Sequence, residues 1–436
     1  MLDPGETSYG DLTFPDSHPG IIAALASLKG LAPPAVDNCR VLELGCGTGF
    51  NLLAMSQSIP GGHFTGIDYS QAHIQRADSV ATAIGARNIE FHCLSIDDYH
   101  APANSFDYII AHGVYSWVPA KTRDAILAII QRSLSPHGLA YVSYNTHPGW
   151  HLRNLVRDGL RYCGSPAKLD QLTASLINPD SPYARAIRAE WANAREQPDY
   201  YLAHEYLVPN CDPVYFHEFV RHAEMHQLQF VAEARFFANS FAQIETTHDQ
   251  LGPDPLQREQ HLDWLVGRYF RQSVLCHSGL ELITDPDPQT ILDLNIARTA
   301  ENPTEITDEL FQIVRSQLDK AGVIPAQNLE LPGMPAAFLA AVLWSGWRDG
   351  LWAIRADTPA TTPNVSANPI ACPLARLQAS AGPNCTNRHH RSVVLTPEEQ
   401  QLLVTLDGTP NDNPLLPRLA DLAFLTPPVP ATGSGH

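Results

Sequence analysis

Apolar and polar positions in residues 39–144 follow two alternating periods. Short apolar runs predict strands at 39–44, 62–67, 89–93, 106–111 and 138–144. The amphipathic stretches between them predict helices at 50–58, 71–84 and 121–133. Strands that alternate with helices form a parallel sheet covered on both faces, so the pattern predicts a doubly wound, Rossmann-like α/β sheet. Ligands of such sheets bind beyond the carboxyl ends of the strands.

The pattern changes after this unit. Residues 151–212 look helical and irregular, with proline breaks, which indicates an inserted segment. A helix at 213–226 and strands at 228–233 and 270–276 come next, and they would complete a seven-stranded sheet. Beyond residue 281 the pattern predicts helices at 307–321, 334–347 and 397–406 and a strand-like run at 389–395. This last block resembles a small winged-helix interaction module.

The predicted domain organisation follows these changes of pattern. Its parts are an N-terminal lid or helix segment at 1–36, a ligand-binding core at 37–150, a helical insertion at 151–212, completion of the sheet at 213–280, a C-terminal regulatory or winged-helix-like domain at 281–426, and a disordered tail at 427–436. The first part has two interpretations: a lid over the ligand, or a plain helix packed on the sheet.

The first strand ends in three glycines at alternate positions, Gly45, Gly47 and Gly49, and a helix follows them. A strand, a glycine turn and a helix N-terminus form a nucleotide-binding corner. Glycine is needed there because the turn requires backbone angles that a Cβ forbids and because the ligand approaches the backbone closely. The alternative is a tight turn without a ligand.

Two acids decide which nucleotide the corner takes. Glu43 lies two residues before the first glycine, where a carboxylate is poorly placed for a pyrophosphate but suits an ammonium group, as in S-adenosylmethionine (SAM). Asp68 ends the next strand, where a carboxylate bonds ribose hydroxyls. The spacing also departs from the dinucleotide pattern G-x-G-x-x-G. Together these residues favour SAM over NAD or FAD.

Three further strand ends carry candidate site residues. After the third strand, Ile96 would lie on an adenine ring and Ser95 or Asp97 near its edge, although an ordinary helix cap is the alternative. After the fourth, His112, Tyr115 and Trp117 lie where a methyl donor would meet its acceptor, with core packing as the alternative for Trp117. After the fifth, the polar and aromatic run 142–150 predicts a wall of the site.

The charge and cysteine content of the chain restrict the kinds of substrate and partner that it can bind. The formal net charge of −18 argues against nucleic acid, because a phosphate backbone requires a basic surface. It is compatible with a basic, lysine-bearing protein substrate, and equally with a surface that only keeps the protein soluble. The eight cysteines form no C-x-x-C pair, so neither zinc nor a disulfide framework is predicted, and a reducing, cytoplasmic setting is the default. No apolar run is long enough to span a membrane.

The glycine corner resembles motif I of class I SAM-dependent methyltransferases. Further stretches resemble bacterial methyltransferases that carry a methyltransferase regulatory domain; these are 143–150, 204–207, 212–219, 270–277, 373–377 and 406–409. The resemblance covers nearly the whole chain and implies the methyltransferase fold and SAM as cofactor. Characterised members include protein-lysine methyltransferases that act on bacterial outer-membrane proteins, which implies such a protein as substrate.

The sequence therefore predicts a SAM-dependent methyltransferase that modifies protein lysines. A small-molecule N- or O-methyltransferase and a non-catalytic SAM-binding regulatory protein are the alternatives. The predicted cofactor site is Glu43, Gly45, Cys46, Gly47, Thr48, Gly49, Asp68, Tyr69, Ser95, Ile96, Asp97 and His112. The predicted catalytic side is His112, Tyr115, Trp117, Tyr144 and Trp150, where the aromatic rings would form a lysine channel and His112 or His147 would accept a proton through water. No metal is predicted.

Overall fold

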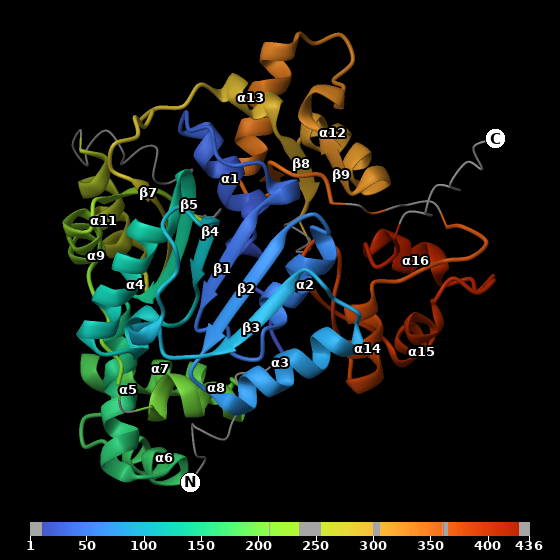
Figure 1. Cartoon of the computed structure of the whole chain (residues 1–436). Helices are drawn as coiled ribbons and strands as arrows, with labels where there is room; N and C mark the ends of the chain where they lie inside the picture. The colour runs from blue at the N-terminus through green and yellow to red at the C-terminus, as the bar shows by residue number, and fades with distance from the viewer. Residues whose placement is uncertain are drawn as a thin grey trace, which may run out of the picture.

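The centre of the fold is a seven-stranded sheet with the order β3-β2-β1-β4-β5-β7-β6 (Figure 1). The computed structural model describes residues 11–208, 210–234, 254–299, 306–359, 361 and 365–426. The strands are β1 (Arg40–Leu44), β2 (His63–Asp68), β3 (Ile89–Cys93), β4 (Phe106–Ala111), β5 (Leu134–Asn145), β6 (Leu228–Glu233) and β7 (Phe270–His277). The first five run parallel, and β7 pairs antiparallel with both β5 and β6. The predicted seven-stranded α/β fold is confirmed.

Alternation along the strands explains why both faces of this sheet are covered. Val41, Tyr108 and Tyr141 face one apolar layer, while Leu42 and Ile109 face the other. The first layer contains residues of α1 (Pro19–Leu28) and α2 (Phe50–Ser58), and the second contains residues of α4 (Ala120–Ser133) and α9 (Phe216–Met225). The remaining helices of this unit are α3 (Gln71–Ala83) and α11 (Pro255–Val266). Apolar residues on both faces are typical of buried parallel strands.

A group of helices follows β5, at the edge where the parallel strands end. It consists of α5 (Trp150–Cys163), α6 (Pro166–Ala174), α7 (Pro182–Arg195), α8 (Asp199–Leu202) and a π-helix over Ala203–Leu207. Val156, Leu169 and Trp191 give these helices a small apolar core of their own. They lie below the sheet in the view of Figure 1.

The chain ends in two smaller units. The first is an antiparallel sheet of β8 (Asn295–Arg298), β9 (Val323–Pro325) and β10 (Trp352–Arg355) with α12 (Glu309–Ala321) and α13 (Ala336–Arg348). The second contains α14 (Pro373–Ala381), β11 (Asn384–Thr386), β12 (Ser392–Val394), α15 (Pro397–Thr405) and α16 (Leu416–Asp421). Its Leu374, Leu403 and Phe424 share one apolar cluster with Phe50 and Leu53 of α2. The second unit is therefore packed against the helix that follows the glycine turn.

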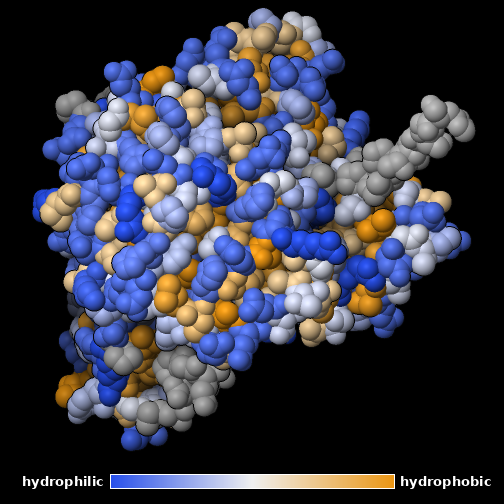
Figure 2. All heavy atoms as spheres, viewed as in Figure 1, coloured by the Kyte–Doolittle hydropathy of each residue, from blue (hydrophilic) through white to orange (hydrophobic). Residues whose placement is uncertain are grey.

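The surface of the molecule is mainly hydrophilic on one face. Hydrophilic residues cover most of the face in Figure 2, with small hydrophobic patches among them. None of the helices that the structure describes is both long and apolar enough to cross a membrane. The predicted tail at 427–436 lies outside the described residues, as do residues 1–10 of the predicted N-terminal segment.

Candidate functional site

The glycine turn joins β1 to α2, and its three glycines differ in what surrounds them. All three have positive φ angles, +74° at Gly45, +53° at Gly47 and +76° at Gly49. A Cβ at Gly45 would lie 2.5 Å from a methyl of Val114, and one at Gly49 would lie 2.6 Å from the ring of Phe91. Among the residues that the structure describes, a Cβ at Gly47 would meet nothing within 4 Å. Gly45 and Gly49 are thus required by packing, whereas Gly47 borders open space, as a ligand cradle does.

Asp68 lies at the end of β2 and holds the turn in place. Its Oδ2 accepts a hydrogen bond from the Gly47 backbone N–H at 2.9 Å, and its Oδ1 accepts one from Ser70 N–H at 2.9 Å. The nearby Ser70 side chain caps α3 by accepting from His73 N–H. His73 Nδ1 lies 3.4 Å from Oδ1, whereas Oδ2 has a second lone pair, so Asp68 keeps acceptor capacity for a hydroxyl group there.

Glu43 is a buried acid of the corner whose hydrogen bonding is incomplete. Its Oε1 accepts a 2.8 Å hydrogen bond from Asn51 Nδ2, but its Oε2 is buried with no hydrogen-bond partner in the described part of the chain. Burial raises the pKa of the Glu43 carboxyl to about 8, and the Asn51 hydrogen bond offsets only part of this rise. A cation beside Oε2 would relieve both problems. The ammonium group of SAM is such a cation, so these residues fit the predicted cofactor.

The N-terminal segment crosses this corner. Asp11 lies 3.3 Å from the Thr48 hydroxyl and forms an ion pair with Arg76 of α3. Phe14 donates its backbone N–H to Asn51 Oδ1 at 3.0 Å, and its ring stacks on His112 at 3.5 Å between centroids. Residues 11–14 therefore lie across the glycine turn and the end of β4. Movement of the segment as a lid stays a prediction.

His112 follows β4 and is held between other rings. Its Nδ1 lies 2.9 Å from the Tyr141 hydroxyl, and the ring of Phe270 is 6.0 Å away, edge-on. Burial lowers the pKa of His112 to about 3. The imidazole is then neutral and a weak base at physiological pH. It suits a wall or hydrogen-bonding position better than a general base.

Two of the predicted channel rings lie in the packed interior. Tyr115 is 2% exposed and its hydroxyl lies 2.7 Å from His222 Nδ1. Tyr144 is 1% exposed, stacks on Phe219 at 4.1 Å and hydrogen-bonds Ser273. Their membership of a lysine channel stays a prediction, since these contacts alone explain why the rings are held in place.

The two predicted tryptophans meet each other edge-to-face at 6.2 Å. The guanidinium groups of two arginines on α5 lie near these indole rings. Arg153 lies 5.0 Å from the centroid of Trp150, and Arg157 lies 5.6 Å from that of Trp117. The Arg153 guanidinium is also 4.0 Å from the ring of Tyr269. The aromatic faces in this region thus already hold cations of the chain itself.

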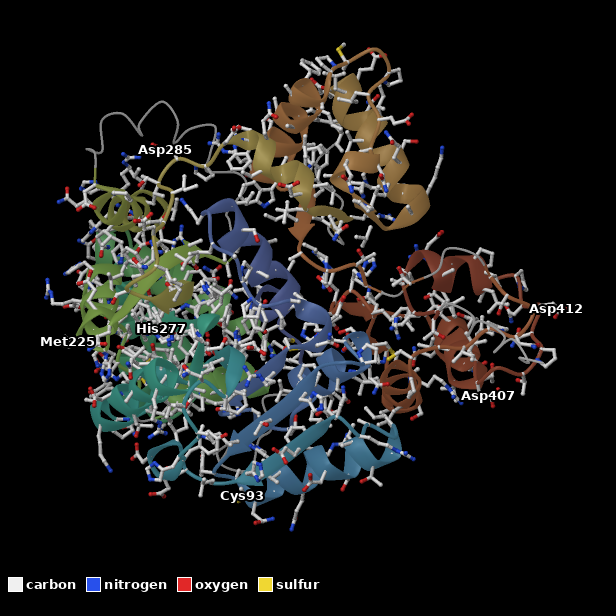
Figure 3. The ribbon with its side chains drawn as sticks, turned by 45° about the horizontal axis from the view of Figure 1, so that its top comes forward. Cys93, Met225, His277, Asp285, Asp407 and Asp412 are labelled. Atoms are coloured by element: carbon white, nitrogen blue, oxygen red, sulfur yellow. The ribbon has the colours of Figure 1, made fainter. Side chains whose placement is uncertain are left out.

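The predicted adenine side is arranged around the end of β3, which Cys93 marks in Figure 3. Ser95 caps the short helix over Ile96–Asp98 by accepting from Asp97 N–H, which is the helix-cap interpretation. Ile96 is buried, and one oxygen of Asp97 lies 3.5 Å from Lys121. Tyr69, after β2, is 81% exposed and has an open ring face. Cys46 is buried below the turn, where its N–H donates to Ile67 O.

The structure brings in residues that the sequence analysis did not assign to the site. Asn51 links Glu43 to the N-terminal segment, and its Oδ1 also lies 2.7 Å from His390 Nε2 in the C-terminal unit. Phe14 and Phe270 flank His112. An asparagine in the apolar run of α2 was a usable signal for Asn51, because a buried amide needs partners. Nothing in the sequence pairs it with His390.

The sheet order, the glycine turn and its two acids together define a class I SAM-dependent methyltransferase. Comparisons with known proteins agree. The sequence matches a family described as "Methyltransferase domain" at residues 35–188, a "Predicted methyltransferase regulatory domain" at 198–277, and a "PKMT, C-terminal winged helix domain" at 367–424. The chain belongs to the SAM-dependent methyltransferases that combine these three parts.

Individual relatives support this assignment. Uncharacterized protein RP028 of Rickettsia prowazekii is 34% identical, and the match covers 50% of this chain and 92% of that protein. Uncharacterized protein RP789 of the same organism is 35% identical over 67% of this chain and 55% of its own length, so the chain spans about half of that relative. The solved structure of PKMT2 from Rickettsia typhi in complex with AdoHcy has a TM-score of 0.79, 25% identity, and coverage of 92% of this chain and 89% of PKMT2.

Proposed function

We propose that this protein binds SAM at the glycine corner and transfers its methyl group to lysine side chains of a protein substrate. The observation that carries the proposal is the similarity to PKMT2, a protein-lysine methyltransferase, which extends over 92% of this chain and includes the winged-helix part. PKMT2 was solved with AdoHcy, the product that SAM leaves after it has lost the methyl group. The corner residues of this chain offer that cofactor suitable partners.

The proposed roles of the corner follow from its geometry. Glu43 Oε2 would accept from the ammonium group, and Asp68 would accept from the ribose hydroxyls. Tyr69, with its exposed ring, would cover the adenine. SAM supplies a methyl group that its sulfonium already activates, so the chain has mainly to hold the acceptor in line with it.

The acceptor must be the neutral amine, because its nitrogen lone pair forms the new bond to the methyl carbon while the bond to sulfur breaks. A lysine ammonium has an ordinary pKa of about 10.4, and burial beside apolar rings lowers it. Phe14, His112 and Phe270 form such a wall at the end of β4. We assign His112 to this wall rather than to proton transfer, since the pKa of about 3 leaves it a weak base.

The charge of the chain suits a basic substrate. The sequence has 46 acidic and 28 basic residues. A net negative surface attracts a lysine-bearing segment and raises its association rate at low salt. We also propose an outer-membrane protein as the substrate and the cytoplasm as the place of modification, both on the family resemblance.

A labelled-methyl transfer assay tests this function. The purified chain is incubated with SAM labelled in its methyl group and with fractionated bacterial lysate, and the labelled product is mapped by mass spectrometry. The expected product is a protein methylated on lysine, and the label should be lost with Asp68→Ala. The matched control is Asp107→Ala, because Asp107 lies at the other end of the sheet, bonded to Arg40.

Other outcomes of this assay identify the alternatives. Label in a small molecule of the lysate would replace the protein substrate by a small-molecule acceptor. SAM binding in calorimetry without any transfer would identify a regulatory SAM-binding protein. Label that persists undiminished in Asp68→Ala would remove the assigned corner from the reaction.

A further inference from the structure

Two histidines and an aspartate, residue types that can ligate a metal, lie together between α9 and α4, outside the corner. His222 on α9 and His226 at its C-terminal cap are four residues apart, so one helical turn brings both imidazoles to the same face. Asp124 of α4 lies opposite them, with Oδ1 at 3.5 Å from His222 Nε2 and 2.9 Å from His226 Nε2. Their ligand atoms all lie within 4.8 Å of one another.

These separations match a tetrahedral metal site. Zinc binds nitrogen and carboxylate oxygen at about 2.0–2.2 Å, which places neighbouring ligand atoms of a tetrahedron about 3.3 Å apart. Two imidazoles and one carboxylate are a zinc ligand set that leaves the fourth position for water. Magnesium and calcium prefer oxygen ligands, so a site with two imidazole nitrogens selects a transition metal instead.

A second observation supports ligation rather than a simple hydrogen-bonded cluster. The buried Tyr115 hydroxyl lies 2.7 Å from Nδ1 of His222, the ring nitrogen that does not face Asp124. Metal-ligating histidines are oriented by such a partner on their other nitrogen. When Nδ1–H donates to Tyr115, the lone pair of Nε2 points toward Asp124 and His226. One histidine of the set is therefore already oriented for a metal.

We propose that Asp124, His222 and His226 form a site for a divalent transition metal, with zinc as the best fit. The Asp124 side chain is 64% exposed, and Met225, labelled at the edge of the molecule in Figure 3, is 71% exposed beside His226, so a metal can enter from solvent. The ion joins α9, which lies within the matched regulatory part, to α4 of the core. Through Tyr115 it also holds the turn after β4.

Zinc titration of the tag-free, metal-free chain tests the proposal. Calorimetry should show one zinc ion bound per chain, and cobalt should give the intense visible absorption of tetrahedral coordination. His226→Ala and Asp124→Asn should each weaken zinc binding by about tenfold or more, and Tyr115→Phe by about tenfold. The matched control is His217→Ala, an exposed histidine of the same helix that hydrogen-bonds Gln260 instead.

The variants keep the result decisive even if one of them misfolds. Asp124 is exposed, so Asp124→Asn leaves the packing of α4 intact while it removes the charged ligand. Circular dichroism checks the fold of each variant before titration. Binding that is equal in the wild type and in His222→Ala/His226→Ala, or no stoichiometric binding in the wild type, would overturn the proposal.

Discussion

At the scale of single residues, Glu43 shows how a binding site stores unfavourable energy. A carboxyl group that is 2% exposed, with one oxygen unpaired, opposes folding when it is charged. Such a group is retained where a ligand compensates for it. On the proposed function, this acid would favour a ligand with a positive charge.

Glu43→Gln should therefore raise stability and weaken SAM binding. The ordinary carboxyl pKa of 4.5 rises to about 8 in the folded protein, so between these values the folded state holds a proton that the unfolded chain releases. The contribution of Glu43 to the free energy of unfolding therefore falls as pH rises through this window. The neutral amide avoids that loss, so the free energy of unfolding of Glu43→Gln at about pH 8 should exceed that of the wild type by on the order of a few kcal/mol, measured by thermal unfolding.

The pH dependence of SAM affinity gives the complementary result. Protonation of Glu43 below about pH 8 removes the charge that the ammonium needs, so wild-type affinity should fall as pH is lowered, whereas Glu43→Gln should be weak throughout. Calorimetry with SAM at several pH values measures this. Equal affinity of the two proteins at alkaline pH would show that the carboxylate does not contact the cofactor.

At the scale of elements, the turn between β1 and α2 contains one glycine that is needed for packing and another that borders the proposed ligand site. Gly49 is the N-cap of α2 and has no space for a side chain, because Phe91 and Ala77 lie against it. Gly47 has space but requires the same left-handed backbone. Glycine is thus required at Gly49 by close packing and backbone conformation, and at Gly47 by backbone conformation alone, although the two positions look equivalent in the sequence.

Gly49→Ala and Gly47→Ala should fail in different ways. Gly49→Ala must displace Phe91 in addition to adopting a left-handed conformation. We therefore expect the free energy of unfolding to fall by about 2–4 kcal/mol and the protein to unfold at a lower temperature. Gly47→Ala should cost only about 1 kcal/mol in stability but should weaken SAM binding strongly, because its Cβ enters the cradle. Thermal unfolding and SAM calorimetry on both variants separate the effects; a reversed order would contradict these roles.

At the scale of the whole molecule, the corner is connected to distant parts of the chain. Asn51 bonds Glu43 on one side and His390 of the winged-helix part on the other. His390 and His18 are buried and lie edge-on at 5.3 Å, and Arg355 of β10 donates to His18. Burial lowers the pKa of both histidines, so they are neutral partners in this network. The cofactor corner is thereby completed by residues more than 300 positions away.

His390→Ala should weaken SAM binding although His390 does not belong to the methyltransferase sheet. Loss of its hydrogen bond frees the Asn51 amide that positions Glu43, and a single such bond contributes about 1 kcal/mol, or roughly fivefold in affinity. The neighbouring His389→Ala is the control, because the His389 side chain is half-buried and its Nε2 has no hydrogen-bond partner among the residues that the structure describes. Equal affinity losses in both variants would attribute the effect to general destabilisation.

Much of the fold was predictable because its signals are local. The strand and helix predictions over 39–144 are confirmed to within a few residues, and β5 is longer at both ends because pairing with its neighbours extends it. The cofactor is likewise confirmed at the level of the family. The roles of the individual site residues stay predictions. Tyr115, Tyr144 and Trp150 show the difficulty, since an aromatic residue at a strand end has the same local signature whether it faces a ligand or the core.

The sequence by itself determined the sheet, the glycine turn and the two acids, because a strand period, a left-handed turn and a charged side chain are properties of a few adjacent residues. Only the tertiary structure decided that Asn51 meets His390, that Phe14 covers His112, and that His222 and His226 meet Asp124. Such contacts join residues far apart in the chain, and their energy depends on how whole elements pack. No local pattern encodes them.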